Sequence, residues 1–429
     1  MSPLAQLARE YQAGRVHGIT SVCSAHPSVI RAALRQGRES GATVLIEATC
    51  NQVNHEGGYT GMRPADFRRF VEGIAAEVDF DTARLILGGD HLGPNPWRSQ
   101  PAEEALAKAE TMVAAYVAAG FSKIHLDASM GCAGEPEGLD DETTAHRAAR
   151  LAKVAEAAAR DAGVPPPLYI IGTEVPTPGG ALHELDDVPP TSAAAAKKTI
   201  ATHRRVFAEQ GLDAAFDRVI GLVVQPGVEF GHESVVVYRP ERARELVAVL
   251  KDEPQFVFEA HSTDYQPEEA LAALVRDGFP ILKVGPGLTF ALRQTLYGLD
   301  LIASELDAAY GGRALANAME ALMLSEPGNW QRYYPGTPDE QHVLRHYSYS
   351  DRIRYYWPHE QAERAVARLM ATLKGRTIPE PLIAQFLPEE AEAVRSGASA
   401  ATAEALLERG VERVLALYAR ACEPAATAG

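Results

Sequence analysis

The sequence predicts an α/β fold, a closed (β/α)8 barrel with a helical appendage at its C-terminal end. Two observations favour this fold. Short runs rich in Val, Ile and Leu alternate with longer amphipathic stretches up to about residue 300, and eight such runs are present. Apolar strands alternating with helices are typical of a parallel sheet covered on both faces, and a barrel of this kind usually takes about 250 residues. A doubly wound sheet is the competing fold, but no GxGxxG motif follows the first run.

Each predicted strand ends in polar residues, and most are followed by a stretch with helical character. Several of these stretches open with Pro or Thr, which is typical of the first turn of a helix. The strands are predicted at 18–26, 43–52, 84–93, 123–129, 168–176, 219–227, 256–262 and 280–289. The helices between them are predicted at 64–78, 101–119, 141–162, 191–210, 240–250 and 267–277.

The pattern changes after residue 310, where only helical segments follow, at 313–324, 361–374, 388–395 and 402–421. We therefore divide the chain into a barrel that carries the site (1–309), a C-terminal helical extension (310–423) and a disordered tail (424–429). An aromatic cluster interrupts the extension, and we expect it to form the interface with the barrel. It comprises Trp330, Tyr333, Tyr334, Tyr347, Tyr349, Tyr355, Tyr356 and Trp357.

Composition excludes several classes of protein. The 41 Lys and Arg residues against 57 Asp and Glu give a net charge of −16, whereas binding nucleic acid requires a basic face. The 4 Cys residues are widely spaced without a CxxC motif, which disfavours a disulfide framework or zinc finger and predicts a reducing cytoplasm. Residues 1–15 lack the apolar core of a signal peptide, and no run approaches the ~20 apolar residues that cross a membrane.

The predicted site lies at the C-terminal ends of the strands, where barrel enzymes carry their chemistry. Asp90 and His91 end the third run, and we expect both to reach the site because the strand breaks just beyond them, at residues 93–94. Residues two apart on a strand share a face, which pairs His125 with Asp127 and Glu259 with His261. Imidazole and carboxylate groups together are typical of a Zn²⁺ or Mn²⁺ site.

For His91 and His261 we favour metal ligation, whereas for His125 ligation and a hydrogen bond to Asp127 are equally open. Glu174 and Glu259 could exchange protons on opposite faces of a carbon beside a carbonyl, or could orient the histidines. Lys283 could form a Schiff base, but we prefer an ion pair or an anion contact because a metal would make the imine redundant.

The last two strand ends carry the features of the usual barrel phosphate grip. Ser262 and Thr263 end the seventh run, and Gly285 and Gly287 follow the eighth, where backbone N–H groups can bind an anion. The glycine-rich segment 57–62 is predicted to be a mobile lid. Arg293, Arg352 and Arg354 could bind a distal phosphate, although salt bridges explain them as readily.

Long stretches of the chain resemble the Z subunit of class II D-tagatose-1,6-bisphosphate aldolase, the GatZ/KbaZ family. This resemblance implies a TIM barrel of ketose phosphate metabolism, either a non-catalytic, chaperone-like partner of a catalytic Y subunit or a ketose 4-epimerase. No P-loop, GxxxxGK(S/T), supports a kinase. The stretches are 21–27, 45–54, 88–95, 123–129, 172–176, 224–230, 259–266, 282–292 and 350–358.

The chain also resembles the catalytic class II aldolases more distantly, through Asp90-His91, residues 126–129, His261 and Lys283. It departs from them at the sixth strand. Those enzymes have a metal-binding His there, whereas this chain has Gln225, and Gln is a poor zinc ligand. Glu174 is therefore the first choice to complete the metal shell.

We expect an enzyme of ketohexose or ketose phosphate metabolism that uses Zn²⁺, with Mn²⁺ as the alternative. Asp90 would take the C4 hydroxyl proton so that the C3–C4 bond breaks, giving aldol cleavage or, after re-addition, 4-epimerisation. The alternative is a non-catalytic subunit that stabilises a separate aldolase subunit; a homo-oligomer is also expected. The candidate residues are Asp90, Asp127, Glu174 and Glu259 for catalysis, His91, His125, Glu174 and His261 for the metal, and Ser24, His26, Glu47, Asn51, Gln225, Ser262, Lys283, Gly285 and Gly287 for substrate.

Overall fold

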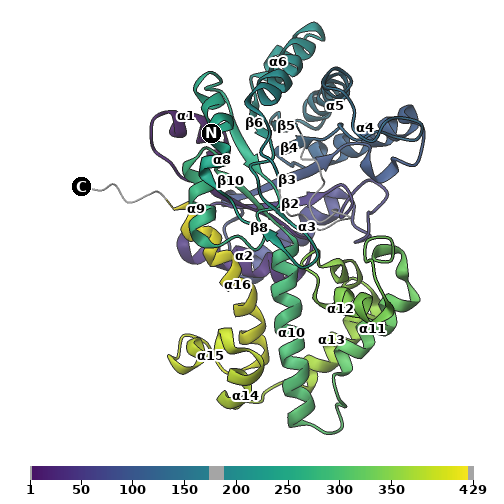
Figure 1. The fold of residues 1–429 in the computed structure, drawn as a ribbon, viewed down its shortest axis with the longest axis vertical. Coiled ribbons are helices and arrows are strands. Elements are labelled where there is room, and N and C mark those ends of the chain that lie inside the picture. Colours follow the sequence, from purple (N-terminus) through teal and green to yellow (C-terminus); the bar gives the residue numbers. More distant parts are fainter. Residues whose placement is uncertain (1, 173–187, 424–429) are drawn as a thin grey trace.

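The computed structural model describes residues 2–172 and 188–423. Eight parallel strands close into a barrel in the order β1-β10-β9-β6-β5-β4-β3-β2, and every predicted run contains one of them (Figure 1). The predicted (β/α)8 fold is therefore confirmed. The barrel strands are β1 (Ile19–Cys23), β2 (Val44–Thr49), β3 (Leu85–Leu92), β4 (Lys123–Leu126), β5 (Leu168–Ile171), β6 (Val219–Val223), β9 (Val257–Ala260) and β10 (Ile281–Val284), and a short antiparallel pair, β7 (Glu229–Phe230) and β8 (Val235–Val236), follows β6.

Helices surround the barrel and bury the outward faces of its strands. All six helices predicted between strands are present, whereas α1, α2, α7 and α10 were not predicted. The predicted eighth run, 280–289, covers the start of α10, because the strand ends at Val284 and Pro286 begins the helix. The helices of this part are α1 (Leu7–Gln12), α2 (Pro27–Ser40), α3 (Pro64–Glu77), α4 (Ala102–Ala118), α5 (Asp141–Ala162), α6 (Ala193–Glu209), α7 (Asp213–Phe216), α8 (Pro240–Ala248), α9 (Glu268–Arg276) and α10 (Pro286–Leu306).

Two long helices, α10 and α16, connect the helical extension to the barrel and run side by side away from it (Figure 1). Its last helix returns to the barrel: α16 packs on α2, α9 and β1, and the Gly18 N–H donates to the Cys422 carbonyl at 2.9 Å. The division at residue 309 therefore stays a prediction, since α16 also belongs to the outer layer of the barrel. The helices are α11 (Ala314–Ser325), α12 (Pro338–Tyr347), α13 (Glu360–Leu373), α14 (Glu380–Phe386), α15 (Pro388–Arg395) and α16 (Ala403–Cys422).

Some members of the aromatic cluster pack in the core of the extension, whereas others lie above the strand ends of the barrel. Trp330, Tyr334, Tyr356 and Trp357 are buried, whereas Tyr347 is exposed. Among the described residues, no helix combines the length and apolar character needed to cross a bilayer, and all 4 cysteines are free. The tail predicted at 424–429 lies outside the described residues.

Candidate active site

A layer of buried charges crosses the barrel interior beneath the strand ends. The Lys123 ammonium lies 2.6 Å from Glu47 Oε1 and 2.8 Å from Glu259 Oε2, and all three side chains are fully buried. Lys283 Nζ contacts the same two carboxylates at 3.1 and 3.6 Å. Gly88 makes room for this layer, since a Cβ there would collide with the Glu47 carboxylate. Glu47 and Glu259 therefore lie inside the barrel, where they neutralise lysines.

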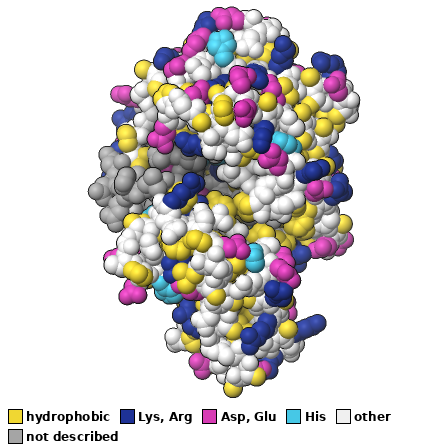
Figure 2. Space-filling model, turned by 90° about the vertical axis from the view of Figure 1, so that its right-hand side faces the viewer, with side chains coloured by type: hydrophobic (Ala, Val, Ile, Leu, Met, Phe, Trp, Pro, Cys, Tyr) yellow, Lys and Arg dark blue, Asp and Glu magenta, His cyan; other side chains and the backbone are white. Residues whose placement is uncertain are grey.

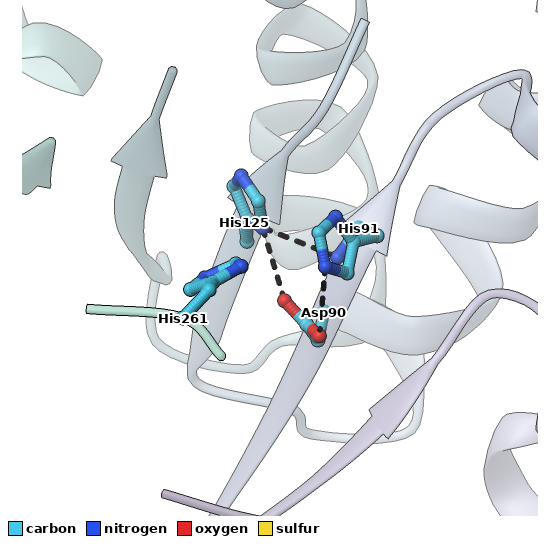
Figure 3. A group of neighbouring side chains, drawn as sticks. All are labelled: Asp90, His91, His125 and His261. Carbon is cyan, nitrogen blue, oxygen red and sulfur yellow. Dashed lines mark hydrogen bonds and ion pairs between the residues drawn. The ribbon is translucent and has the colours of Figure 1, made fainter. Parts of the chain in front are cut away.

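Above this layer, four side chains converge from three strands or strand ends. One ligand atom from each of Asp90, His91, His125 and His261 lies within 4.8 Å of the others (Figure 3). Adjacent Asp90 and His91 both reach the site because the pairing of β3 with β4 is irregular between Gly89 and Leu92, and because His91 takes a left-handed backbone with φ of 49°. The expected break lies within the strand, before Gly93. A left-handed φ is rare outside glycine and is often found at functional sites.

The hydrogen bonds cross between strands. His91 Nδ1 lies 2.8 Å from Asp127 Oδ2, so that Asp127 orients His91. His125 Nδ1 lies 3.0 Å from Asp90 Oδ1, and its Nε2 lies 2.8 Å from the Gly172 carbonyl. The hydrogen bond between His125 and Asp127 that the sequence left open is therefore replaced by these two contacts.

The donors of this cluster fit a cation. Because the Gly172 carbonyl can only accept, His125 Nε2 donates to it, and His125 Nδ1 faces the cluster. His125 Nδ1 lies 3.2 Å from the His91 N–H, a donor, and 3.0 Å from Asp90 Oδ1, an acceptor. Lys283, which forms an ion pair with Asp90 Oδ1, already supplies one positive charge here, and a proton or a metal ion between the two groups would supply another. Three imidazoles and one carboxylate are donors suited to a divalent transition metal.

The electrostatics of the cluster keep Asp90 ionised. Burial raises the pKa of Asp90, but His91, Lys283, His125 and His261 together hold that pKa well below its usual value. Burial, reinforced by Lys283, lowers the pKa of His261 to about 3, so its ring is neutral, the form that binds metals. For His91, burial lowers the pKa, but Asp90 and Asp127 outweigh that effect and raise it.

Three other residues predicted from the sequence, Glu259, Gln225 and Glu174, are not among the four residues of this cluster. Glu259 Oε1 lies 3.0 Å from His261 Nε2, as the shared face predicted. The Gln225 side chain accepts hydrogen bonds from the N–H groups of Gly227 and Val228, both at 2.8 Å, and so holds the turn after β6. Glu174 lies outside the described residues.

The predicted phosphate grip is already occupied by a carboxylate of the chain itself. Asp264 Oδ1 accepts from the N–H of Gly285 at 3.0 Å and from the N–H of Gly287 at 2.6 Å. Burial raises the pKa of Asp264 to about 6, although these two N–H groups lower it. The sequence indicated the right N–H groups but missed Asp264; its place three residues after His261, facing the next strand end, was the available signal.

A cavity of 1580 Å³ opens above the cluster, between the strand ends and the extension. The surface in Figure 2 is hollowed between its upper and lower parts, with Lys and Arg side chains at the edge of the hollow. Tyr59 lies in segment 57–62, the predicted lid, and its ring contacts the ring of Tyr355 edge-on, with 4.9 Å between the ring centres. This segment therefore contacts the extension. Of the candidates, Ser24, His26, Asn51, Asp90, His91, Ser262, Lys283 and Gly285 line the cavity, whereas Glu47, His125, Asp127, Gln225, Glu259, His261 and Gly287 do not.

Comparisons with known proteins agree on one family. Residues 4–423 match the family described as D-tagatose-1,6-bisphosphate aldolase subunit GatZ/KbaZ-like. The chain is 61% identical to a D-tagatose 6-phosphate 4-epimerase of Agrobacterium fabrum, over 97% of each chain. It is 49% identical to the D-tagatose-1,6-bisphosphate aldolase subunit GatZ of Salmonella enteritidis, over 98% of this chain and 99% of the relative.

One solved structure shares the fold and more than half of the sequence. The crystal structure of a probable tagatose 6 phosphate kinase from Sinorhizobium meliloti superposes with a TM-score of 0.88 at 56% identity, over 94% of this chain and 100% of that chain. Because the family match and both sequence relatives span nearly the whole chain, the chain belongs to the GatZ/KbaZ-like family of D-tagatose-1,6-bisphosphate aldolase subunits.

Proposed function

We propose that the protein is a metal-dependent 4-epimerase of a ketohexose phosphate, which acts by breaking and re-forming the C3–C4 bond. The observation that carries this proposal is the ionised Asp90 beside three histidines and Lys283, with Asp90, His91 and Lys283 lining the cavity. The relative that is 61% identical is named a D-tagatose 6-phosphate 4-epimerase, which favours an enzyme over the non-catalytic subunit.

We propose His91, His125 and His261 as the groups that hold the metal, with Glu174 as a further candidate, and Asp90 beside them as the base. Zn²⁺ is the first choice because imidazole nitrogens dominate the donor set, and Mn²⁺ is the alternative. Bound there, the ion supplies a Lewis acid for the ketose carbonyl.

In the proposed reaction, Asp90 accepts the proton of the C4 hydroxyl group. The C4 oxygen becomes an aldehyde carbonyl as the C3–C4 bond breaks. The electron pair of that bond stays on C3 and is delocalised onto the C2 oxygen, which gives an enediolate. The aldehyde rotates and presents its other face, C3 attacks it, and Asp90 returns the proton to the C4 oxygen. The product has the opposite configuration at C4. Asp127 keeps His91 oriented throughout.

Release of the two fragments instead of re-addition would give aldol cleavage with the same residues. The relative that is 49% identical is named an aldolase subunit, which supports this as the second candidate activity. Association with a separate aldolase subunit and homo-oligomerisation stay predictions. The 4 free cysteines support the predicted cytoplasmic location.

The test is to incubate the purified chain, loaded with Zn²⁺ or Mn²⁺, with D-tagatose 6-phosphate carrying deuterium at C4. We expect D-fructose 6-phosphate that retains the label, because C3–C4 cleavage never breaks the C4–H bond. Asp90→Asn should slow conversion by about 10²–10⁴, and Asp66→Asn is the matched control because Asp66 is a solvent-accessible carboxylate on α3. Loss of the label would refute the proposed mechanism, and no conversion by the metal-loaded chain would refute the proposed function. Accumulation of triose products would favour the aldolase.

A further inference from the structure

The cavity has to neutralise an anionic substrate without the usual N–H groups. In many barrels the loops after the last strands bind phosphate, but here the N–H groups of Gly285 and Gly287 are bound to Asp264. A carboxylate in that position also repels a second anion. Any phosphate of the substrate must therefore bind elsewhere in the cavity.

Two arginines of the extension are the strongest candidates. Arg352 and Arg354 lie on the 3-10 helix Arg352–Tyr356 and both line the cavity. Arg352 donates to the Asn329 carbonyl, and Arg354 donates to the carbonyls of Ser350 and Asp351. These acceptors are neutral. Within residues 2–172 and 188–423, neither guanidinium forms an ion pair with a carboxylate, although Asp264 and Asp351 lie near enough to feel the charge of Arg354.

The third arginine proposed from the sequence is used differently. The Arg293 guanidinium lies 3.7 Å from Asp351 Oδ1, stacks on Phe290 at 4.1 Å and does not line the cavity. Two further arginines, Arg98 and Arg332, line the cavity but are exposed, so that water can solvate them. Arg352 is only 6% exposed, and a buried cation without a counter-ion is costly.

Aromatic rings hold the two guanidinium groups in place. The Arg352 guanidinium stacks 3.4 Å from the centre of the Tyr333 ring, and both arginines flank the Tyr355 ring, at 5.1 and 4.5 Å. Burial raises the pKa of Tyr355, but Arg354 and Arg352 outweigh this effect and lower it, as expected of an uncompensated positive field. Guanidinium groups that are fixed in position and not neutralised are suited to bidentate hydrogen bonding of a phosphate.

We propose that Arg352 and Arg354 form the binding site for the phosphate monoester of the substrate, so that the extension selects phosphorylated over free ketoses. This inference rests on the proposed function for the identity of the sugar. The site itself needs only a phosphate dianion, which allows it to be tested separately.

The first test measures binding of inorganic phosphate to the full-length protein by calorimetry. Arg354→Gln should weaken binding at least tenfold, and Arg354→Lys should weaken it less because the charge is kept. Arg364→Gln is the matched control, since Arg364 is an exposed arginine of α13 paired with Glu360. Equal affinity in Arg354→Gln and the wild type would overturn the assignment.

The second test compares kcat/KM for D-tagatose 6-phosphate with that for free D-tagatose. In Arg354→Gln the ratio of the two values should fall at least tenfold, and in Arg364→Gln it should not change. An unchanged ratio in Arg354→Gln, in a wild type that does convert the phosphorylated sugar, overturns the phosphate site alone. A wild type that converts no ketose but binds phosphate through Arg354 contradicts the proposed function and supports the site.

Discussion

Replacing Lys123 by Met should destabilise the fold severely. Lys123 lies between Glu47 and Glu259, and Lys283 is the only other lysine ammonium near this layer in the described part of the chain. With Asp90, which also pairs with Lys283, three carboxylates now face two ammonium groups, and in Lys123→Met they would face one. Met keeps most of the length of the side chain, so that the change removes mainly the charge and its hydrogen bonds.

The expected cost is about 3–5 kcal/mol in the free energy of unfolding, the usual range for removing one partner of a buried ion pair. The upper half of that range is favoured because both carboxylates are fully buried and would be left to share Lys283. Removing a negative charge as well should recover much of the loss. In a double-mutant cycle, Lys123→Met with Glu259→Gln should therefore cost less than the sum of the single changes.

The assay is equilibrium urea unfolding followed by near-UV circular dichroism. The matched control is Lys197→Met, because the Lys197–Asp252 pair has the same 2.6 Å separation but is exposed on both sides, and it should change stability little. A loss below about 1 kcal/mol in Lys123→Met, or additive costs in the double variant, would refute the account of a buried, mutually compensated charge layer.

Three further predictions concern the residues above this layer. Asp90→Asn should lower kcat by about 10²–10⁴ with an unchanged circular dichroism spectrum, as is typical for loss of a general base. Removing metal with a chelator should lower both activity and melting temperature, and Zn²⁺ should restore both; a melting curve insensitive to chelator and metal would contradict the site. The pKa of Asp264 is about 6 when folded against 3.8 for the free group, so its stabilising contribution is complete below pH 4 and is lost as pH rises through 6. Asp264→Asn should therefore be more stable than wild type at pH 7, by up to about 3 kcal/mol, and equally stable near pH 4, as measured by urea unfolding at both pH values.

Strand parity explains which parts of the site could be predicted from the sequence. Alternation along a strand placed Glu259 and His261 on one face, and the structure joins them at 3.0 Å. It could not choose between the partners of His125, because the contact with Asp90 depends on the pairing of β3 with β4 and on the irregularity after Gly89. A local backbone departure of this kind leaves no periodic signal.

The residues that were missed also have physical reasons. Lys123 lies two residues before His125 on the same strand and therefore points inward as His125 does. A single Lys at the start of an apolar run, however, usually keeps its ammonium group exposed to solvent. Asp264 lies beyond the seventh strand, and its hydrogen bonds to Gly285 and Gly287 join two loops separated along the chain. Contacts between loops depend on the closed barrel, which the pattern of one segment does not contain.

The buried charge layer itself favours a catalytic role over a purely stabilising one. Apolar side chains of similar volume could replace a buried ion network with no loss of stability, and often with a gain. A subunit that served only to stabilise a partner would have no physical need for this layer. Lys283 gives it a use, because its ammonium contacts Glu47 and Glu259 below and Asp90 above, and it also lines the cavity. Of the charges in this layer, Lys283 helps to keep Asp90 ionised, and Asp90 is the group that the proposed reaction needs as a base.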